Sequence, residues 1–151
     1  GFLLNNQMTD FSFLPEQDGA PVANRIQPGK RPRSAMSPTL VLDQQGQVQM
    51  AVGSPGGSLI IHYVAQALLG LLEWRLDPQA AANLPHYGSR NGPTELEADQ
   101  QLERLIEPLR QRGHEVKLTP MTSGLSIIVR QPQGGYLGGA DPRREGKVSG
   151  F

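Results

Sequence analysis

Gly53-Ser54-Pro55-Gly56-Gly57 leads directly into an apolar segment that runs from Ser58 to Trp74. Two glycines after a proline let the backbone turn without Cβ atoms shielding its N–H groups. A helix that begins at Ser58 leaves its first N–H groups unpaired and places the positive end of its dipole beside the turn. The junction therefore predicts a site for negative charge: a phosphate, a carboxylate or the oxyanion of a tetrahedral intermediate. A plain Pro-Gly-Gly turn is the alternative, and no Gly-Lys-Ser/Thr follows that would make it a P-loop.

The segment after the turn is predicted to be a mostly buried helix over residues 58–74. Apolar positions cover most of its surface, and the polar positions fall on one narrow stripe, which consists of His62, Gln66 and Glu73. No second His lies within helical reach of His62. We therefore expect His62 to be a surface or boundary residue and not a metal ligand.

Strands are expected wherever short apolar runs are bounded by turn residues. They lie at 2–4, 39–42, 47–52, 94–98, 116–118, 125–130 and 136–140. The segments 39–42 and 47–52 should form a hairpin that delivers the chain into the glycine turn. Residues 14–32 and 86–93 are expected to be loops.

Two further helices are expected from their caps. Asp77-Pro78 opens a short helix through Leu84. Asp99 caps another, which Pro108 should kink and Gly113 should end. Strands and helices occur in separate runs, which predicts an α+β fold with helices layered on a mainly antiparallel sheet.

The composition excludes several classes of function. Fourteen basic residues balance 14 acidic ones, so the net charge gives no reason to expect a nucleic acid or an anionic membrane as partner. The absence of cysteine excludes disulfides, thiol catalysis and cysteinyl zinc sites. The longest apolar run, 59–72, is too short to span a bilayer. Lys30-Arg31-Pro32-Arg33 is interpreted as a solvated basic corner.

Four stretches together resemble the small subunit of γ-glutamyltransferase (γ-glutamyl transpeptidase), a family of the N-terminal nucleophile hydrolase superfamily. In chain order they are Leu3 to Ser12, Lys30 to Thr39, Gly53 to Ser58 and Gly139 to Arg143. Each stretch alone is weak, but all four occur in the order of the family. The resemblance implies a part of a four-layer αββα sandwich, with no cofactor and no metal.

The resemblance also assigns roles to individual residues. Gln7 and Asp10 fall on positions that bind the ammonium of a γ-glutamyl substrate such as glutathione. Ser34 falls on the first of two serines that bind its carboxylate, and Ala35 replaces the second. Gly56 and Gly57 fall on the pair whose N–H groups form the oxyanion hole.

The family nucleophile is a threonine freed by self-cleavage, with its own amine as base. Gly1 is not that threonine, so we expect residues 1–151 to be the C-terminal portion of a small subunit, an incomplete domain. Its partners would be the preceding segment and the large subunit. The chain alone should be inactive, and its exposed strand edges should favour self-association.

Two alternatives stay open. Ala35 and a short loop from Ser12 to Lys30 are compatible with a cephalosporin (glutaryl) acylase, or with a poly-γ-glutamyl substrate. A catalytically dead homologue would serve as a binding or scaffold protein. Family members are often periplasmic or secreted, but the sequence leaves the compartment open.

Overall fold

The computed structural model describes residues 4–98 and 100–150. The chain divides into two compact units, one ending at Ser34 and the other beginning at Ala35. Each unit is described by itself. Most of the strand predicted at 2–4, and the cap predicted at Asp99, lie outside the described residues.

The first unit contains little regular structure. A 3-10 helix, η1, spans Gln7–Asp10, and two short strands pair antiparallel, β1 (Glu16–Gln17) with β2 (Ala20–Pro21). The sequence predicted a plain loop here. The difference arises at Asp18 and Gly19, whose φ angles of 53° and 75° give the tight turn that an Asp-Gly pair favours in hairpins.

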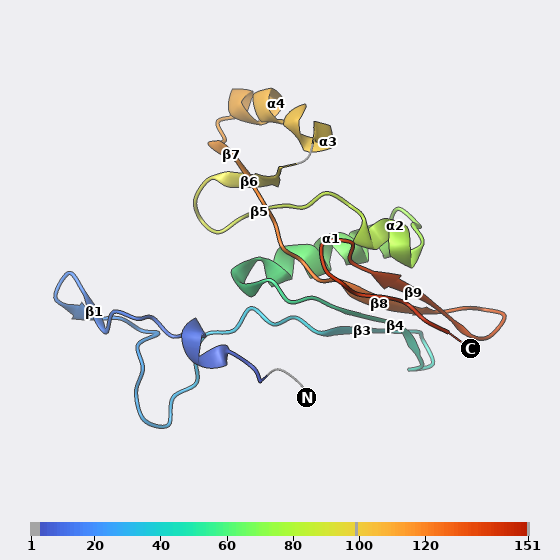
Figure 1. Ribbon diagram of the computed structural model, residues 1–151, viewed down its shortest axis with the longest axis horizontal. Coiled ribbons are helices and arrows are strands. Elements are labelled where there is room, and N and C mark those ends of the chain that lie inside the picture. The colour runs from blue at the N-terminus through green and yellow to red at the C-terminus, as the bar shows by residue number, and fades with distance from the viewer. Residues whose placement is uncertain (1–3, 99, 151) are drawn as a thin grey trace. The chain divides into compact units, whose positions relative to one another are not determined.

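A four-stranded antiparallel sheet in the order β3-β4-β8-β9 organises the second unit (Figure 1). Its strands are β3 (Thr39–Leu42), β4 (Val48–Gly53), β8 (Ser126–Arg130) and β9 (Tyr136–Ala140). All four strands were predicted. The helices α1 (Ile60–Leu72) and α2 (Pro78–Ala82) lie along one face of this sheet (Figure 1). Val52 and Ile127 from the sheet join Tyr63, Val64 and Ala67 from α1 in the buried core.

The predicted hairpin between β3 and β4 is confirmed. The Asp43 carboxylate accepts the N–H groups of Gln45 and Gln47, at 2.9 and 2.8 Å. Gly46 completes the turn with a φ of 76°. β4 then runs into the glycine turn as expected.

The helix after the turn differs from its prediction in its ends and in its polar stripe. It begins as a 3-10 turn, η2 (Gly57–Leu59), and α1 ends at Leu72. The predicted polar stripe is wrong, because Gln66 is buried and Ile61 and Leu69 are exposed. Gln66 points inward since its amide nitrogen donates to the Pro85 carbonyl at 2.6 Å. His62 lies at the boundary, as predicted.

A smaller sheet in the order β5-β6-β7 belongs to the same unit. Its strands are β5 (Tyr87–Ser89), β6 (Thr94–Glu97) and β7 (Val116–Thr119). β5 lies in a segment predicted to be a loop, so that prediction is wrong. β6 and β7 pair in parallel, with α3 (Gln100–Glu103) and α4 (Ile106–Gln111) in the crossover between them (Figure 1).

Proline decides where the predicted last helix is interrupted. The chain leaves helical geometry between α3 and α4, four residues before the expected kink at Pro108. Pro108 thereby falls in the first turn of α4, where no helical partner for its nitrogen is needed. Gly113 ends α4 with a φ of 88°, and its N–H donates to the Arg110 carbonyl. The predicted glycine terminus is confirmed as a Schellman motif.

The described residues form a mixed α+β fold with mostly antiparallel sheets, which confirms the predicted class. None of their helices has the length and apolar character that crossing a bilayer requires.

Candidate functional site

One pocket of the first unit brings together the three predicted substrate-binding residues. Gln7, Asp10 and Ser34 line a hollow of about 290 Å³. η1 presents Gln7 and Asp10 on one short turn, and this turn is fixed because Thr9 donates its N–H and its hydroxyl to the Asn6 carbonyl at 3.0 and 2.7 Å. A carboxylate, an amide and a hydroxyl are therefore gathered around a space large enough for the end of an amino acid.

Asn24 ties the two sides of this pocket together. Its amide nitrogen donates to the Asp10 carbonyl at 2.7 Å, and its amide oxygen accepts the Arg33 N–H at 2.9 Å. The Asn24 carbonyl also accepts the Ser12 N–H at 2.9 Å. A single side chain thus sets the spacing between η1 and the segment that carries Ser34.

Arg31 and Arg33 of the basic stretch at 30–33 are exposed, in agreement with its interpretation as a solvated corner. Arg31 and Arg33 line the same pocket as Asp10. Lys30 is used structurally, since its ammonium donates to the Ala23 carbonyl. The pocket therefore has an acidic and a basic part.

The glycine turn of the second unit has the backbone geometry that an anion site requires. Gly56 has φ 136° and ψ 18°, and Gly57 has φ 61°. Within the described part of the chain, the N–H groups of Gly56 and Gly57 have no hydrogen-bond acceptor. Their two donors are thus available to a ligand.

Gly56 and Gly57 have different surroundings. A Cβ at Gly56 would lie 2.5 Å from the Tyr63 ring, so the residue must be glycine for steric reasons as well as for its φ angle. A Cβ at Gly57 would meet no atom within 4 Å. The turn is therefore packed on the side of Tyr63 and open at Gly57.

A buried polar cluster packs against Tyr63. The Tyr63 ring lies against the His86 ring, with centroids 4.4 Å apart. The two His86 ring nitrogens face Gln66 Oε1 at 3.0 Å and Ser123 Oγ at 2.8 Å. Ser123 donates in turn to Asp141, which also accepts the Leu125 N–H at 3.0 Å.

This cluster has the residue types of a catalytic triad but not its arrangement. In a triad the carboxylate orients the histidine, and the serine is accessible to substrate. Here Asp141 contacts Ser123, and His86 and Ser123 have no exposed surface. The cluster is therefore structural.

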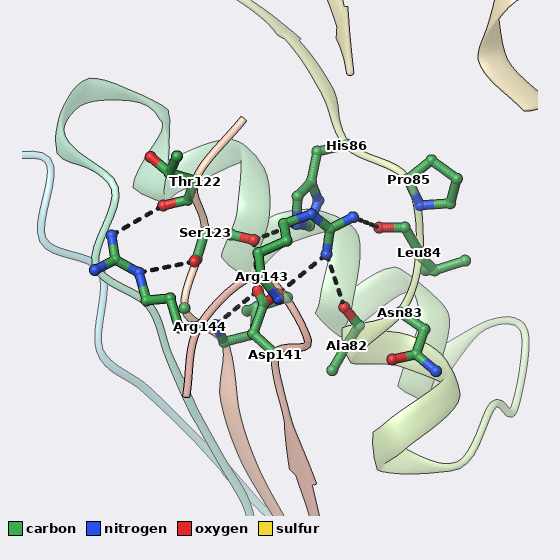
Figure 2. Close-up of polar contacts among 12 residues, drawn as sticks. Ala82, Asn83, Leu84, Pro85, His86, Thr122, Ser123, Asp141, Arg143 and Arg144 are labelled. Atoms are coloured by element: carbon green, nitrogen blue, oxygen red, sulfur yellow. Dashed lines mark hydrogen bonds and ion pairs between the residues drawn. The ribbon is translucent and has the colours of Figure 1, made fainter. Parts of the chain in front are cut away.

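Two arginines connect this cluster to the surrounding chain (Figure 2). Arg143 pairs with Glu97 at 2.5 Å and with Asp141 at 3.1 Å, and it donates to the Ala82 and Leu84 carbonyls. Arg144 donates to the carbonyls of Thr122 and Ser123, at 3.1 and 2.9 Å (Figure 2).

The segment held by these arginines contacts the glycine turn. The Gly124 N–H donates to Ser54 Oγ at 3.0 Å. The Thr122 carbonyl lies 3.6 Å from the position that a Gly56 Cβ would occupy. The chain of contacts from Asp141 through residues 122–124 thus fixes the shape of the turn.

Sequence reasoning proposed roles for the glycines and the pocket residues, and it missed this cluster. The stretch Gly139 to Arg143 was noted only as part of the resemblance, and no role was assigned to Asp141 or Arg143. Gln66 carried a usable signal, since an amide in a helix that is otherwise buried needs a buried partner.

The cluster makes stability depend on pH. Burial, followed by the charge of Arg143, lowers the pKa of His86 from 6.5 to about 4. Between pH 6.5 and pH 4, His86 is protonated in the unfolded chain but stays neutral in the folded chain. The free energy of unfolding therefore falls as the pH drops from 6.5 towards 4. The loss should be about 3 kcal/mol, measured as urea unfolding of the complete protein across this range.

Asp141 extends the loss to lower pH. Burial alone would raise the pKa of Asp141, but hydrogen bonds from Ser123, Leu125 and Arg143 outweigh it and lower the pKa below 3.8. Its contribution is lost only below the range in which His86 titrates. His86→Gln should be less stable at neutral pH but should show a flatter profile between pH 6.5 and 4. An unchanged slope in His86→Gln would refute the assignment to His86.

No group of three or more His, Asp or Glu side chains within residues 4–98 and 100–150 is arranged to hold a metal ion.

Known proteins resemble the chain over nearly its whole length. The glutathione hydrolase proenzyme of Escherichia coli strain K12 is 36% identical over 95% of the chain, and the acylase ACY 1 proenzyme of Pseudomonas sp. strain SE83 is 32% identical over 97%. The chain spans only 26% and 25% of these two relatives. A crystal structure of γ-glutamyltranspeptidase from Helicobacter pylori matches 95% of the chain, and 82% of its own chain, with 31% identity and a TM-score of 0.76.

The family model for gamma-glutamyltranspeptidase matches residues 1–151. The chain therefore belongs to the gamma-glutamyltranspeptidase family.

Proposed function

We propose that the complete protein transfers or hydrolyses the γ-glutamyl group of glutathione and other γ-glutamyl amides. The reaction would pass through an acyl-enzyme on a threonine outside residues 1–151. This chain would supply the pocket that binds the glutamyl end and the turn that stabilises the oxyanion. The observation that carries the proposal is the gathering of Gln7, Asp10 and Ser34 around one pocket.

The chemistry of the pocket fits an α-amino acid. A γ-glutamyl group ends in an ammonium and a carboxylate on the same carbon. Asp10 provides a charged acceptor for the ammonium, and Gln7 provides an amide beside it. Ser34 provides a hydroxyl donor for the carboxylate. Hydrogen bonds that involve a charged group are roughly twice as strong as neutral ones, so Asp10 carries the largest share of recognition.

Gly56 and Gly57 take the part of the oxyanion hole. During acyl transfer the carbonyl oxygen of the substrate becomes negative, and donors aimed at it lower the barrier. The open space at Gly57 leaves room for the carbonyl to approach. Because both donors are backbone groups fixed by the packing of Tyr63, they need no rearrangement during the reaction.

The bare face of the large sheet supports the proposed four-layer architecture. α1 and α2 cover one face, whereas Leu40 and Ile128 are 65% and 52% exposed. These two side chains and Ala51 line an apolar hollow of about 460 Å³. In an αββα sandwich this face packs on a second sheet, which we place in the part of the protein outside residues 1–151.

Asp10→Asn should separate the recognition of ammonium from the remaining chemistry. The loss of a charge-assisted bond should lower kcat/KM on γ-glutamyl-p-nitroanilide by about tenfold to a hundredfold. The kcat/KM for glutaryl-p-nitroanilide, which has the carboxylate but no ammonium, should not change. Steady-state release of p-nitroaniline by the complete, self-processed protein measures both.

Two controls define the result of this experiment. Ser34→Ala removes a neutral donor and should have a smaller effect on the γ-glutamyl substrate than Asp10→Asn. Self-cleavage, followed by gel electrophoresis, should proceed in both variants. An Asp10→Asn protein that fails to mature would show that Asp10 is structural, which would contradict its role in substrate binding.

A glutaryl acylase is the second candidate, and the similarity to the acylase proenzyme favours it. Its substrate lacks the ammonium, so Asp10 would have no charged partner. The two activities are separated by comparing γ-glutamyl-p-nitroanilide with glutaryl-7-aminocephalosporanic acid. Cleavage of the cephalosporin alone would replace the first proposal by the second.

A further inference from the structure

We infer that Arg33 binds the α-carboxylate of the γ-glutamyl donor and makes the pocket selective for acyl groups that carry this carboxylate. The inference rests on the proposed function, since it concerns the same pocket. It adds a residue for which the resemblance gave no role and which the sequence suggested was merely solvated.

The charges around the pocket fit a zwitterion. Asp10 is the one carboxylate of its lining, and Arg31 and Arg33 are two guanidiniums. An α-amino acid end presents one positive and one negative group about 2–3 Å apart, so it needs both signs of charge in one small space. Asp10 pairs with the ammonium, and the guanidiniums pair with the carboxylate.

Both guanidiniums are available. Within the described residues, the side chains of Arg31 and Arg33 have no ion pair or hydrogen bond. Arg25, in the same unit, donates instead to the Val22 carbonyl at 3.0 Å. Arg31 and Arg33 therefore do not have to break an internal contact in order to bind an anion.

The backbone distinguishes Arg33 from Arg31. The Asn24 side chain holds the Arg33 N–H and the Asp10 carbonyl at the same time. Arg33 also directly precedes Ser34, the expected hydroxyl donor to the carboxylate. Arg33 is thus the arginine whose backbone is connected to that of Asp10 through one side chain, and Arg31 adds positive potential.

Arg33 also compensates for Ala35, which replaces the second of the two serines that bind the carboxylate in the family. A serine hydroxyl at position 35 would give one neutral donor, and Ala35 gives none. A guanidinium offers several donors in a planar fork that matches the two oxygens of a carboxylate, and it adds a full positive charge. The pocket can therefore bind the carboxylate strongly without the second hydroxyl.

Three anilide substrates test the inference on the complete, self-processed protein. γ-Glutamyl-p-nitroanilide carries both charged groups, glutaryl-p-nitroanilide only the carboxylate, and γ-aminobutyryl-p-nitroanilide only the ammonium. Arg33→Gln should raise KM about tenfold for the two substrates with a carboxylate and leave their kcat nearly unchanged. KM for γ-aminobutyryl-p-nitroanilide should stay the same.

Two further variants make the result specific. Arg33→Lys keeps the positive charge and should recover most of the affinity, and it also serves if Arg33→Gln does not mature. Arg104→Gln removes an exposed arginine outside the pocket, and it should change neither KM nor kcat for any of the three substrates. Arg104 thereby controls for the loss of a charge as such.

The possible outcomes distinguish a failure of the role of Arg33 from a failure of the proposed function. If the wild-type protein cleaves γ-glutamyl-p-nitroanilide but Arg33→Gln affects all three substrates equally, or none, the inference is overturned and the proposed function stands. If the mature wild-type protein does not cleave γ-glutamyl-p-nitroanilide, both fall.

Discussion

Replacing Gly56 by alanine in the complete protein should lower kcat on γ-glutamyl-p-nitroanilide by about 100-fold to 1,000-fold, the usual cost of losing an oxyanion donor. The new Cβ would lie 2.5 Å from the Tyr63 ring, and Tyr63 is buried against His86 and cannot retreat. The turn must move instead, which takes the Gly56 and Gly57 N–H groups out of position. KM should change much less than kcat, because the ground-state carbonyl is bound weakly.

Gly46→Ala provides the matched control. Gly46 also has a positive φ, 76°, but it lies in the β3–β4 turn with no atom within 4 Å of a new Cβ. It should lose about 1 kcal/mol of stability from backbone strain and keep its kcat. A folded and processed Gly56→Ala protein with the kcat of the wild type would exclude this turn as the oxyanion hole.

Asp141→Ala should cost the fold about 3–5 kcal/mol, because it removes one partner of a buried ion pair. The Asp141 side chain is 1% exposed and accepts hydrogen bonds from Ser123, from the Leu125 N–H and from Arg143. Alanine would leave these donors without a buried acceptor. Urea unfolding of the complete protein measures the loss.

Glu73→Ala is the control for Asp141→Ala. Glu73 is an exposed acidic residue at the end of α1, and its loss should change stability by no more than about 0.5 kcal/mol. Equal stability of Asp141→Ala and Glu73→Ala would mean that the buried cluster does not hold the second unit together.

Local rules were enough to predict much of this structure. Short apolar runs bounded by turn residues located β3, β4, β8 and β9, and of these strands β4 and β8 contribute Val52 and Ile127 to the buried core. Asp77 caps α2 as expected, since its carboxylate accepts the Gln79 and Ala80 N–H groups at 2.9 Å. Each of these features depends on residues close in sequence.

The failures involve contacts between residues far apart in sequence. Gln66 turns inward because it meets His86, 20 residues away, and His86 meets Ser123, 37 residues away. Helical periodicity takes account only of the polarity of Gln66 and therefore predicts that it is exposed. That Arg33 and Asp10 line one pocket was likewise not predictable, because Asn24 connects their two segments.

The most direct test of the central claim is the ratio of kcat/KM for γ-glutamyl-p-nitroanilide to that for glutaryl-p-nitroanilide, measured on the complete, self-processed wild-type protein. Asp10 in the pocket predicts a ratio well above one, because the ammonium gains a charged partner there. A ratio at or below one would contradict a donor site built for an α-amino acid.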